Sequence, residues 1–291
     1  MTPIFVLASS TNASVEQQLA RERHKYGDLV QFTDFNDNFT HLSLKVRDYV
    51  RLHAHIERRS AHKVLMMSVD INGFVFAHNL IQLIDSQNET FWNSQLIVGY
   101  CTCKFTTGIC PGAGAAVLRD QKSKWYISKE LWQQSYFPHY CFGFAQLFSP
   151  GVSQALTNAI ARNSNWTDDR IRQFYVDDVL FTGVLRAEAG NASLSDRRDV
   201  FVMASWKQDW AVRLRHCITC VAMHITVGQR GTDWVADVSQ PQLQGSSQNI
   251  YKQWRIYNKE LLLNRTITTT ARPHIMNKVA PPMKRANVVK G

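Results

Sequence analysis

Short apolar runs alternate with amphipathic segments near the N-terminus, and this alternation constrains the fold more than any other feature. Pro3 to Ala8, Leu29 to Phe32 and Lys63 to Ser68 have the length and composition of strands. Val15 to Tyr26 and Leu42 to Arg58 have the helical period, with charges on the outer face. Strands that alternate with helices predict a mostly parallel, doubly wound α/β sheet, in which ligands bind at the carboxyl ends of strands.

The remainder of the chain has a less regular pattern. Ser94 to Leu147 alternates aromatic and polar residues and predicts antiparallel strands and loops, whereas Ala189 to Asp199 reads as a polar loop. The other expected elements are a loop entering a helix over Asp168 to Arg186, strands over Val200 to Val227 and a helix over Asn249 to Leu263. We expect a single domain over residues 1–270, with a donor half to about residue 90 and an acceptor half from about 91. We expect residues 271–291 to form a basic, solvated tail.

Composition narrows the functional class. The 291 residues are 45% hydrophobic and carry a net charge of +10. A basic field attracts nucleic acid and anionic membranes, but these charges are scattered and accompany no nucleic-acid-binding motif, so we expect no nucleic-acid partner. The sequence contains no apolar stretch long enough to span a bilayer, and Pro3 to Ala8 is too short for a signal peptide.

Cysteines and glycosylation sequons favour an oxidising, secretory compartment. The six cysteines suit disulfides, although their pairing cannot be deduced from spacing. Cys217 and Cys220 have the spacing of half a zinc site, but Cys101 and Cys103 are too close together to supply the other half. Asn-x-Ser/Thr sequons occur at six positions: Asn12, Asn38, Asn88, Asn165, Asn191 and Asn264.

A colinear set of motifs carries a family resemblance. The central pieces are Lys124-Trp-Tyr-Ile-Ser, Tyr136-Phe-Pro-His-Tyr-Cys-Phe-Gly, and Val176-Asp-Asp-Val followed by Gly183. The upstream pieces are Glu22 with Tyr26-Gly-Asp-Leu, then Asp34-Phe-Asn-Asp and Leu42-Ser-Leu-Lys. Over roughly residues 3 to 185 this order resembles the β-1,3-galactosyltransferase family of Golgi hexosyltransferases, which includes β-1,3-N-acetylglucosaminyltransferases.

The resemblance implies a GT-A-like fold and an enzyme of the Golgi lumen. Such an enzyme moves a hexose from a UDP-sugar to a hydroxyl of a glycan on a glycoprotein or glycolipid. Members of the family carry an N-terminal membrane anchor, which is absent from this chain, and the sequence opens at what resembles the family's second strand. We therefore expect a divergent and N-terminally short member.

The donor site is expected at Asp70. Divalent metals such as Mn²⁺ and Mg²⁺ neutralise a leaving diphosphate and prefer carboxylate oxygens. By resemblance, the family's Asp-Asp-Asp motif corresponds here to Asp70-Ile-Asn72, and Ser68 stands where a basic residue is expected. Only the first acid survives, so we expect weakened or lost Mn²⁺ binding by Asp70 and Asn72. The alternative for Asp70 is a solvated turn residue after a strand.

The catalytic base is expected at Asp178. By resemblance, Val176 to Val179 corresponds to the family's Glu-Asp-Val motif, whose Asp deprotonates the acceptor hydroxyl for an inverting attack. Asp177 then stands in place of Glu and faces the acceptor. An adjacent carboxylate raises a pKa, whereas a helix N-terminus lowers it. The alternative is that Asp178 caps the following helix.

Further candidates flank these acids. Arg119 and Lys124 are expected to counter the diphosphate as charge-assisted donors, or else to be surface charges beside a strand. Trp125 and Tyr140 are expected to line the acceptor side, where sugar rings stack on aromatic faces, or else to belong to the core. Gly143 corresponds to the first glycine of the family's glycine-rich turn, and Phe144 follows it with a bulky side chain.

A late histidine completes the metal shell in some relatives. His224 is the first candidate for that role and His216 the second; the alternative for each is a core residue. Two functions remain open at this point. The first is a metal-assisted UDP-sugar transferase, and the second is a catalytically impaired protein of the same fold that binds a glycan or a partner.

Overall fold

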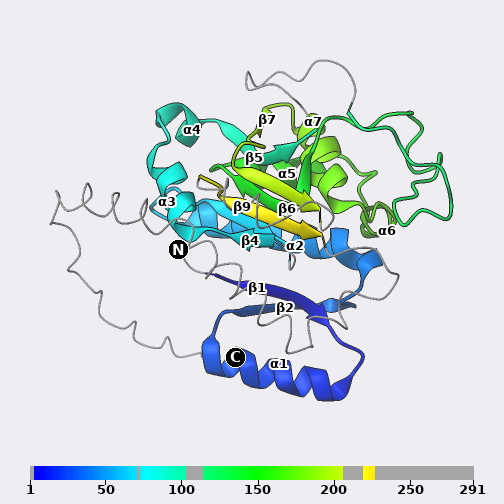
Figure 1. Ribbon diagram of the computed structural model, residues 1–291. Coiled ribbons are helices and arrows are strands. Elements are labelled where there is room, and N and C mark those ends of the chain that lie inside the picture. Colours follow the sequence, from blue (N-terminus) through cyan, green and yellow to red (C-terminus); the bar gives the residue numbers. More distant parts are fainter. Residues whose placement is uncertain (1–2, 71–72, 103–113, 206–218, 227–291) are drawn as a thin grey trace, which may run out of the picture. The chain divides into compact units, whose positions relative to one another are not determined.

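The computed structural model describes residues 3–70, 73–102, 114–205 and 219–226 (Figure 1). The chain divides into two compact units. The first comprises residues 1–213 and 219–231 and contains every described residue, while the second comprises 214–218 and 232–291. The helix expected over Asn249 to Leu263, the tail, Asn72 and His216 lie outside the described residues. The expected single domain over residues 1–270 stays a prediction.

The first described elements form a βαβ unit as predicted. β1 (Phe5–Ser9) and β2 (Leu29–Asn36) pair in parallel, and α1 (Ala13–Tyr26) connects them. The side chain of Asn12 caps α1 by accepting a backbone N–H of its first turn. Gly27 ends the helix with φ 69°, a left-handed conformation that glycine adopts without strain.

The second predicted helix, α2 (Leu42–Arg59), follows the short 3₁₀ turn η1 (Phe39–His41). Its apolar face is buried and its outer face is charged, as the helical period predicts. α2 contacts β1 and also α5 (Val152–Arg162) and α6 (Asp168–Gln173). The helix therefore packs against elements that precede it and elements that follow about a hundred residues later.

A four-stranded mixed sheet forms the centre of the unit. Its strand order is β3 (Met66–Val69), β6 (Cys141–Phe148), β5 (Gln95–Cys101) and β7 (Ala192–Asp196). β6 pairs antiparallel with both β3 and β5, in agreement with the antiparallel region expected over residues 94–147. β5 and β7 are parallel.

A smaller sheet contains β4 (Gly73–Val75), β9 (Ala222–Thr226) and β8 (Phe201–Ser205). β4 runs antiparallel to β9, and β8 runs parallel to it. Two helices, α3 (Ala77–Asp85) and α4 (Glu89–Asn93), connect β4 to β5. Antiparallel pairs are as common as parallel pairs among the described strands, so the prediction of an α/β fold is confirmed but that of a mostly parallel sheet is not.

The predicted polar loop over Ala189 to Asp199 was wrong, because this segment contains β7. Ala192, Leu194 and Asp196 alternate with more exposed residues and turn toward the interior. The buried positions repeat every second residue, which is the period of a strand. The serines between them and the terminal aspartate gave the segment the composition of a loop.

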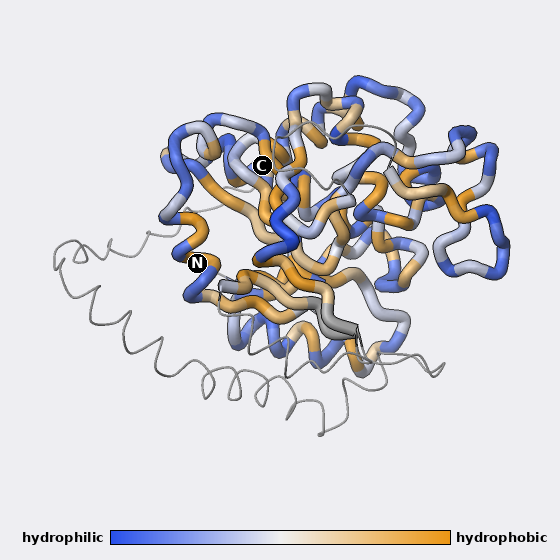
Figure 2. Tube along the Cα trace, turned by 45° about the horizontal axis from the view of Figure 1, so that its top comes forward, coloured by the Kyte–Doolittle hydropathy of each residue, from blue (hydrophilic) through white to orange (hydrophobic). Residues whose placement is uncertain are grey.

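Apolar side chains fill two buried clusters, and Figure 2 shows apolar segments through the middle of the trace with hydrophilic segments mainly at its outer turns. The larger cluster joins α2, α5 and β5 to aromatic residues that include Phe148, Phe174 and Phe181. The smaller cluster contains Phe144, which is buried. The bulky side chain after Gly143 therefore packs into the core instead of toward a ligand. None of the helices in the described ranges is long and apolar enough to cross a membrane.

Candidate functional site

Asp70 lies directly after β3, as the sequence predicts. Its backbone N–H donates to the carbonyl of Phe144 at 3.0 Å, and its own carbonyl accepts from Gly73 at 2.8 Å. A Cβ added to Gly73 would lie 2.6 Å from the Phe144 carbonyl oxygen, so only glycine fits this close approach. These contacts fix the backbone on both sides of the position where the metal-binding triplet was expected.

Two further acids, Asp177 and Asp178, precede η2 (Val179–Leu185), which is a buried turn of π-helix. One carboxylate oxygen of Asp178 accepts the N–H of Val179 at 2.8 Å, and the other accepts the N–H of Gly143 at 3.3 Å. A Cβ on Gly143 would lie 3.4 Å from the Cβ of Asp178. Asp178 thus has the capping role, and the same two bonds fix its orientation.

Residues of the π-helical turn also fix the backbone of Asp178. The hydroxyl of Thr182 donates to the Asp178 carbonyl at 2.7 Å and accepts the N–H of Cys141 at 2.9 Å. Gly183 permits close packing, since a Cβ there would lie 3.2 Å from the Cβ of Tyr140. Short π-helical turns often occur at functional sites, and this one sets the backbone direction of the candidate base.

Three carboxylates that are distant in sequence form one electrostatic group: Asp70, Asp177 and Asp178. Burial raises the pKa of Asp178 to about 6, although hydrogen bonds from Val179 and Gly143 oppose the rise. The pKa of Asp177 lies well above its usual value because of burial and the charges of Asp178 and Asp70. We name these three residues the acid cluster. The fold brings the predicted donor and base residues within electrostatic reach of one another.

The surroundings of Asp70 contain one basic side chain that the sequence analysis did not assign to the site. Asp70 keeps solvent contact, but the protein around its carboxylate displaces enough water to raise its pKa to about 6, while Lys45 acts in the opposite direction. Lys45 is held by Asp37 at 2.8 Å, and Asp37 also accepts the N–H of Ala8 at 2.9 Å. The start of α2 therefore places a cation beside the acid cluster.

Tyr49 is a second residue that sequence reasoning missed. It lies one turn after Lys45 on α2, and its hydroxyl shares a 2.9 Å hydrogen bond with Ser68. Burial, together with the charges of Asp177 and Asp70, raises the pKa of Tyr49. The spacing of four residues on one helix was the available signal, but nothing in the sequence tied that helix to Ser68.

The predicted metal ligands are only partly described. The described ranges contain no group of three or more His, Cys, Asp and Glu side chains that could hold a metal ion. Asn72 lies outside those ranges. The backbone of His224 pairs with that of Gly73, which places His224 on the strand beside the segment that follows Asp70.

Arg119 cross-links a loop through its side chain, and we call this set of hydrogen bonds the loop clamp. Its guanidinium donates to the backbone carbonyls of Ile127, Trp132 and Gln134 at 2.7, 2.6 and 2.8 Å. These bonds tie together the two ends of the segment that contains Lys124 and Trp125. The geometry gives Arg119 a structural role that neither sequence-based alternative anticipated.

We expect Arg119→Ala to destabilise the protein by about 2–3 kcal/mol, because it leaves three carbonyls without a charged donor. Lys124→Ala is the matched control, since loss of its contact with an exposed ring should cost under about 1 kcal/mol. Thermal unfolding of both variants would test this. Equal Tm values for the two variants would show that the three hydrogen bonds of Arg119 do not stabilise the protein.

The aromatic candidates separate into surface and core. Trp125 is 41% exposed, with the Lys124 ammonium 4.5 Å from its ring, and it meets Phe39, which is 43% exposed, edge to face at 5.6 Å. Phe39 also contacts Tyr175, whose hydroxyl donates to Tyr126. Tyr140 is only 8% exposed and belongs to the core, where burial and the charge of Asp178 raise its pKa. Trp125 is therefore available for stacking and Tyr140 is not.

Two pockets share Arg172, and the second of them borders the surface formed by Phe39, Trp125 and Tyr175 through Tyr175. The first, of 520 Å³, lies between β2 and α6 and is mainly polar. The second, of 390 Å³, lies beside Tyr126 and Tyr175. Both volumes are in the range of ligand sites. Neither pocket is lined by a member of the acid cluster.

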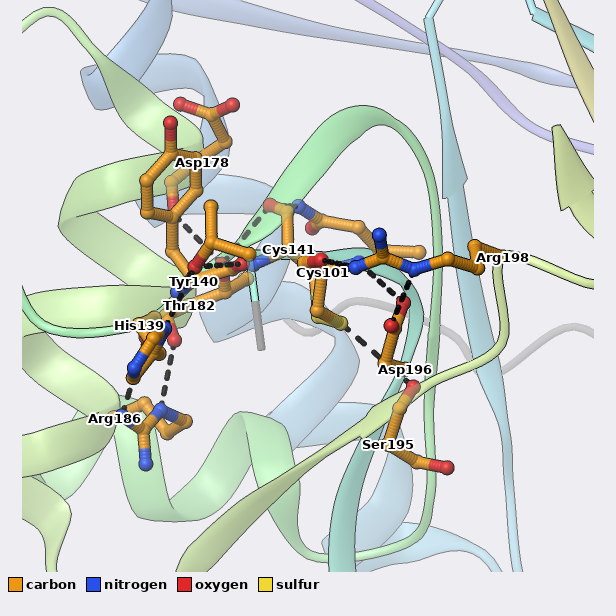
Figure 3. The surroundings of a disulfide bond; sticks show 12 residues. Cys101, His139, Tyr140, Cys141, Asp178, Thr182, Arg186, Ser195, Asp196 and Arg198 are labelled. Atoms are coloured by element: carbon orange, nitrogen blue, oxygen red, sulfur yellow. Dashed lines mark hydrogen bonds and ion pairs between the residues drawn. A yellow bond between two sulfur atoms is a disulfide. The ribbon is translucent and has the colours of Figure 1, made fainter. Parts of the chain in front are cut away.

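The described cysteines are oxidised. Cys101 and Cys141 face each other across β5 and β6 and form a disulfide. Cys220 is also disulfide-bonded, which removes a thiolate from any zinc site at that position. Figure 3 shows Thr182 between Asp178 and Cys141, with Cys101 on the far side of Cys141.

Comparison with known proteins gives a family and several relatives. A family model described as Galactosyltransferase matches residues 1–193. A human lactosylceramide 1,3-N-acetyl-beta-D-glucosaminyltransferase is 26% identical over 180 residues, 60% of this chain and 40% of the relative. A beta-1,3-galactosyltransferase 5 from Pan paniscus is 24% identical over 154 residues, 53% of this chain and 46% of the relative.

A third relative is a human acetylgalactosaminyl-O-glycosyl-glycoprotein beta-1,3-N-acetylglucosaminyltransferase. It is 27% identical over 148 residues, which are 50% of this chain and 33% of the relative. The chain thus spans less than half the length of these three curated relatives.

Proposed function

Because this chain belongs to the galactosyltransferase family, we propose that it is an inverting UDP-sugar hexosyltransferase. It moves galactose or N-acetylglucosamine to a glycan hydroxyl and forms a β-1,3 linkage. The relatives are named for β-1,3 transfer of these sugars. The observation that carries the proposal is the position of Asp178, an oriented carboxylate beside Asp70 in the acid cluster.

Asp178 acts as the general base that removes the proton of the acceptor hydroxyl. Both of its oxygens accept a backbone N–H, yet a carboxylate has further lone pairs with which to accept a hydroxyl proton. A pKa of about 6 leaves the group ionised at neutral pH and makes it a stronger base than an ordinary aspartate. The acceptor oxygen attacks the anomeric carbon as its proton passes to Asp178, and the UDP oxygen departs with the bonding electrons.

Asp70 lies on the donor side. Asp70 has the hard carboxylate oxygens that Mn²⁺ prefers, and Asn72 and His224 are the further proposed ligands; the positive charge of Lys45 beside Asp70 weakens this binding. The ion, when bound, neutralises charge on the diphosphate. Lys124 is the proposed basic contact of the donor, and Arg119 positions it by holding the loop that contains it.

The acceptor side comprises Trp125, Gly143, Asp177 and Tyr140. Trp125 offers an exposed ring for a sugar face. Gly143 keeps the approach to Asp178 open, while Asp177 and Tyr140 shape the wall behind it. The acceptor is a glycan on a glycoprotein or glycolipid, and the compartment is the Golgi lumen, as for the family that the motifs resemble.

One observation favours a second function, a glycan-binding protein without turnover. Asp70-Ile-Asn72 keeps a single acid where the family pattern has three. A neutral amide offsets the desolvation of a divalent ion less well than a carboxylate does. If Mn²⁺ does not bind, the acid cluster repels the diphosphate of the donor. The surface formed by Phe39, Trp125 and Tyr175 can then bind a glycan, but no sugar is transferred.

Thermal unfolding with UDP, in the presence and absence of Mn²⁺, separates the two functions. A ligand at a hundred times its dissociation constant stabilises by about 2.7 kcal/mol, which corresponds to a rise of about 5–10 °C in Tm. We expect a Mn²⁺-dependent rise that Asp70→Ala abolishes and Asp178→Ala preserves. No rise with either addition, in a folded protein, would rule out transfer and favour the second function.

A further inference from the structure

The 390 Å³ pocket has walls that are fixed by hydrogen bonds within the protein. It is lined mainly by a loop over residues 126–131 and by the chain from the end of α6 to Tyr175. Arg170 of α6 donates to the Leu131 carbonyl at 3.0 Å, and the Tyr175 hydroxyl donates to the Tyr126 carbonyl at 2.6 Å. The pocket is therefore formed in the free protein, as is usual for small-ligand sites.

The lining of this pocket combines buried apolar side chains with exposed polar ones. Ile127 and Leu131 are buried, whereas Arg172 and Gln173 are exposed. Nη2 of Arg172 donates to Asp169 at 2.8 Å, so other N–H groups of the guanidinium stay available. The Gln173 carboxamide, which both donates and accepts, is bonded to no described residue. The pocket thus offers apolar contact next to hydrogen-bonding groups.

The charges beside Arg172 favour a neutral ligand group over an anion. Asp169 is paired with Arg172, and its side chain is 78% exposed. A carboxylate or sulfate at Arg172 would lie beside this like charge, which is unfavourable, whereas a neutral carbonyl oxygen accepts from the guanidinium without that repulsion. An acetamido group fits these surroundings. It has a carbonyl oxygen for Arg172, an N–H for the Gln173 oxygen, and a methyl group for Ile127 and Leu131.

Tyr175 connects the pocket to the candidate base. It lines the pocket and lies three residues before Asp178, and three residues of extended chain span at most about 11 Å. Its ring also contacts Phe39, which meets the exposed ring of Trp125. The pocket is therefore continuous with the proposed acceptor surface and lies within the length of a short oligosaccharide from Asp178.

We propose that the pocket is an acceptor subsite for an N-acetylated sugar, located next to the sugar that receives the hexose. Arg172 and Gln173 select the acetamido group, and Ile127 and Leu131 contact its methyl group. The inference rests on the proposed function, because it assigns the second sugar of the same acceptor. It narrows the acceptor to glycans in which the reacting sugar is attached to an N-acetylhexosamine.

The test is the affinity of the full chain for two disaccharides that differ only in this group. Galactose β-linked to N-acetylglucosamine carries the acetamido group, and galactose β-linked to glucose carries a hydroxyl in its place. Calorimetric titration with each, with UDP absent and present, gives the ratio of the two dissociation constants. We expect about tenfold tighter binding of the N-acetylated disaccharide, the effect of one net hydrogen bond to a charged donor.

A second arginine in an equivalent ion pair provides a matched control. Arg172→Ala and Gln173→Ala should each reduce the preference to about threefold or less, because each removes a partner of the acetamido group. Arg51→Ala should keep the preference. Arg51 is 45% exposed and pairs with Asp48 three residues away, as the 46% exposed Arg172 pairs with Asp169, but it lines neither pocket.

Equal affinity for the two disaccharides, no binding of either, or a preference that both variants leave unchanged would overturn the proposal. The UDP-dependent Tm shift is a separate readout, and Arg172→Ala should retain it. A chain that shows this shift but does not distinguish the disaccharides would refute the subsite and leave the transferase function standing. A chain without the shift that still prefers the N-acetylated disaccharide through Arg172 would support the subsite and the glycan-binding function instead.

Discussion

Asp178→Asn is expected to lower kcat by about 10²–10⁴-fold, the usual contribution of a general base. The substitution keeps the size of the side chain and an oxygen for the Val179 N–H, so the π-helical turn retains its cap. It removes the charge that accepts the hydroxyl proton. The assay is transfer from UDP-galactose or UDP-N-acetylglucosamine to a β-linked oligosaccharide acceptor under saturating donor.

The same experiment has a second readout that a structural role would not change. In the wild type, kcat/KM should fall as pH drops through about 6, because Asp178 is active only when ionised and its pKa is raised to about that value by burial. Asp70 adds to the rise, and the N–H groups of Val179 and Gly143 reduce it. Residual activity of Asp178→Asn should lose the contribution of Asp178 to this limb. Asp70, whose pKa is also raised to about 6, keeps its own contribution through donor binding, so the comparison is made on kcat at saturating donor.

The control for folding is the UDP-dependent Tm shift, which Asp178→Asn should retain. Asp177→Asn is the control for charge, since it removes a neighbouring acid and leaves the proposed base in place. Wild-type turnover by Asp178→Asn, with an unchanged pH profile, would assign the base to another residue and leave Asp178 with its capping role.

Local signals predicted much of the fold. The βαβ unit follows from apolar runs, an Asn cap and a Gly stop within one stretch of chain, so sequence order alone determines it. Asp178 was also predictable as a cap, because that role depends on its immediate neighbours. Its contact with Gly143 was not, since it depends on how β6 packs against η2.

The remaining errors come from long-range contacts. β7 reads as a loop until β5 supplies its partner strand, because Leu194 is the only large apolar residue in it and the others are small or polar. Arg119 reads as a surface charge until the loop carbonyls are seen around it. Neither Tyr49 nor Ser68 stands out in the sequence. Only the packing of α2 on β3 brings the two side chains together beside the acid cluster. In each case, the role of the residue depends on contacts with residues distant in sequence, which no local sequence pattern specifies.

Contacts between residues distant in sequence also connect the Cys101–Cys141 disulfide to Asp178, the candidate base. Cys141 begins β6, its N–H is held by Thr182, and Thr182 holds the carbonyl of Asp178. On the other strand, the N–H of Cys101 donates to Asp196 at 3.0 Å. The covalent bond therefore sits between the end of β7 and the turn that orients Asp178.

Replacing both Cys101 and Cys141 with alanine is expected to destabilise the protein by about 4 kcal/mol. The bond closes a loop across a sequence separation of 40 residues, and the chain-entropy relation gives a cost of this size for such a loop. A change of that magnitude lowers Tm by about 8–16 °C. Both cysteines are fully buried, so loss of their packing acts in the same direction.

Thermal unfolding of the oxidised wild type and the double variant measures this effect, with Lys122→Ala, a substitution at an exposed side chain, for comparison. The variant that still folds should also bind UDP, since no donor residue is changed, but its turnover should fall because Thr182 and Asp178 are less firmly held. An unchanged Tm would mean that hydrogen bonds and packing alone hold β5 to β6. Full turnover despite a lowered Tm would separate the stability of the sheet from the orientation of Asp178.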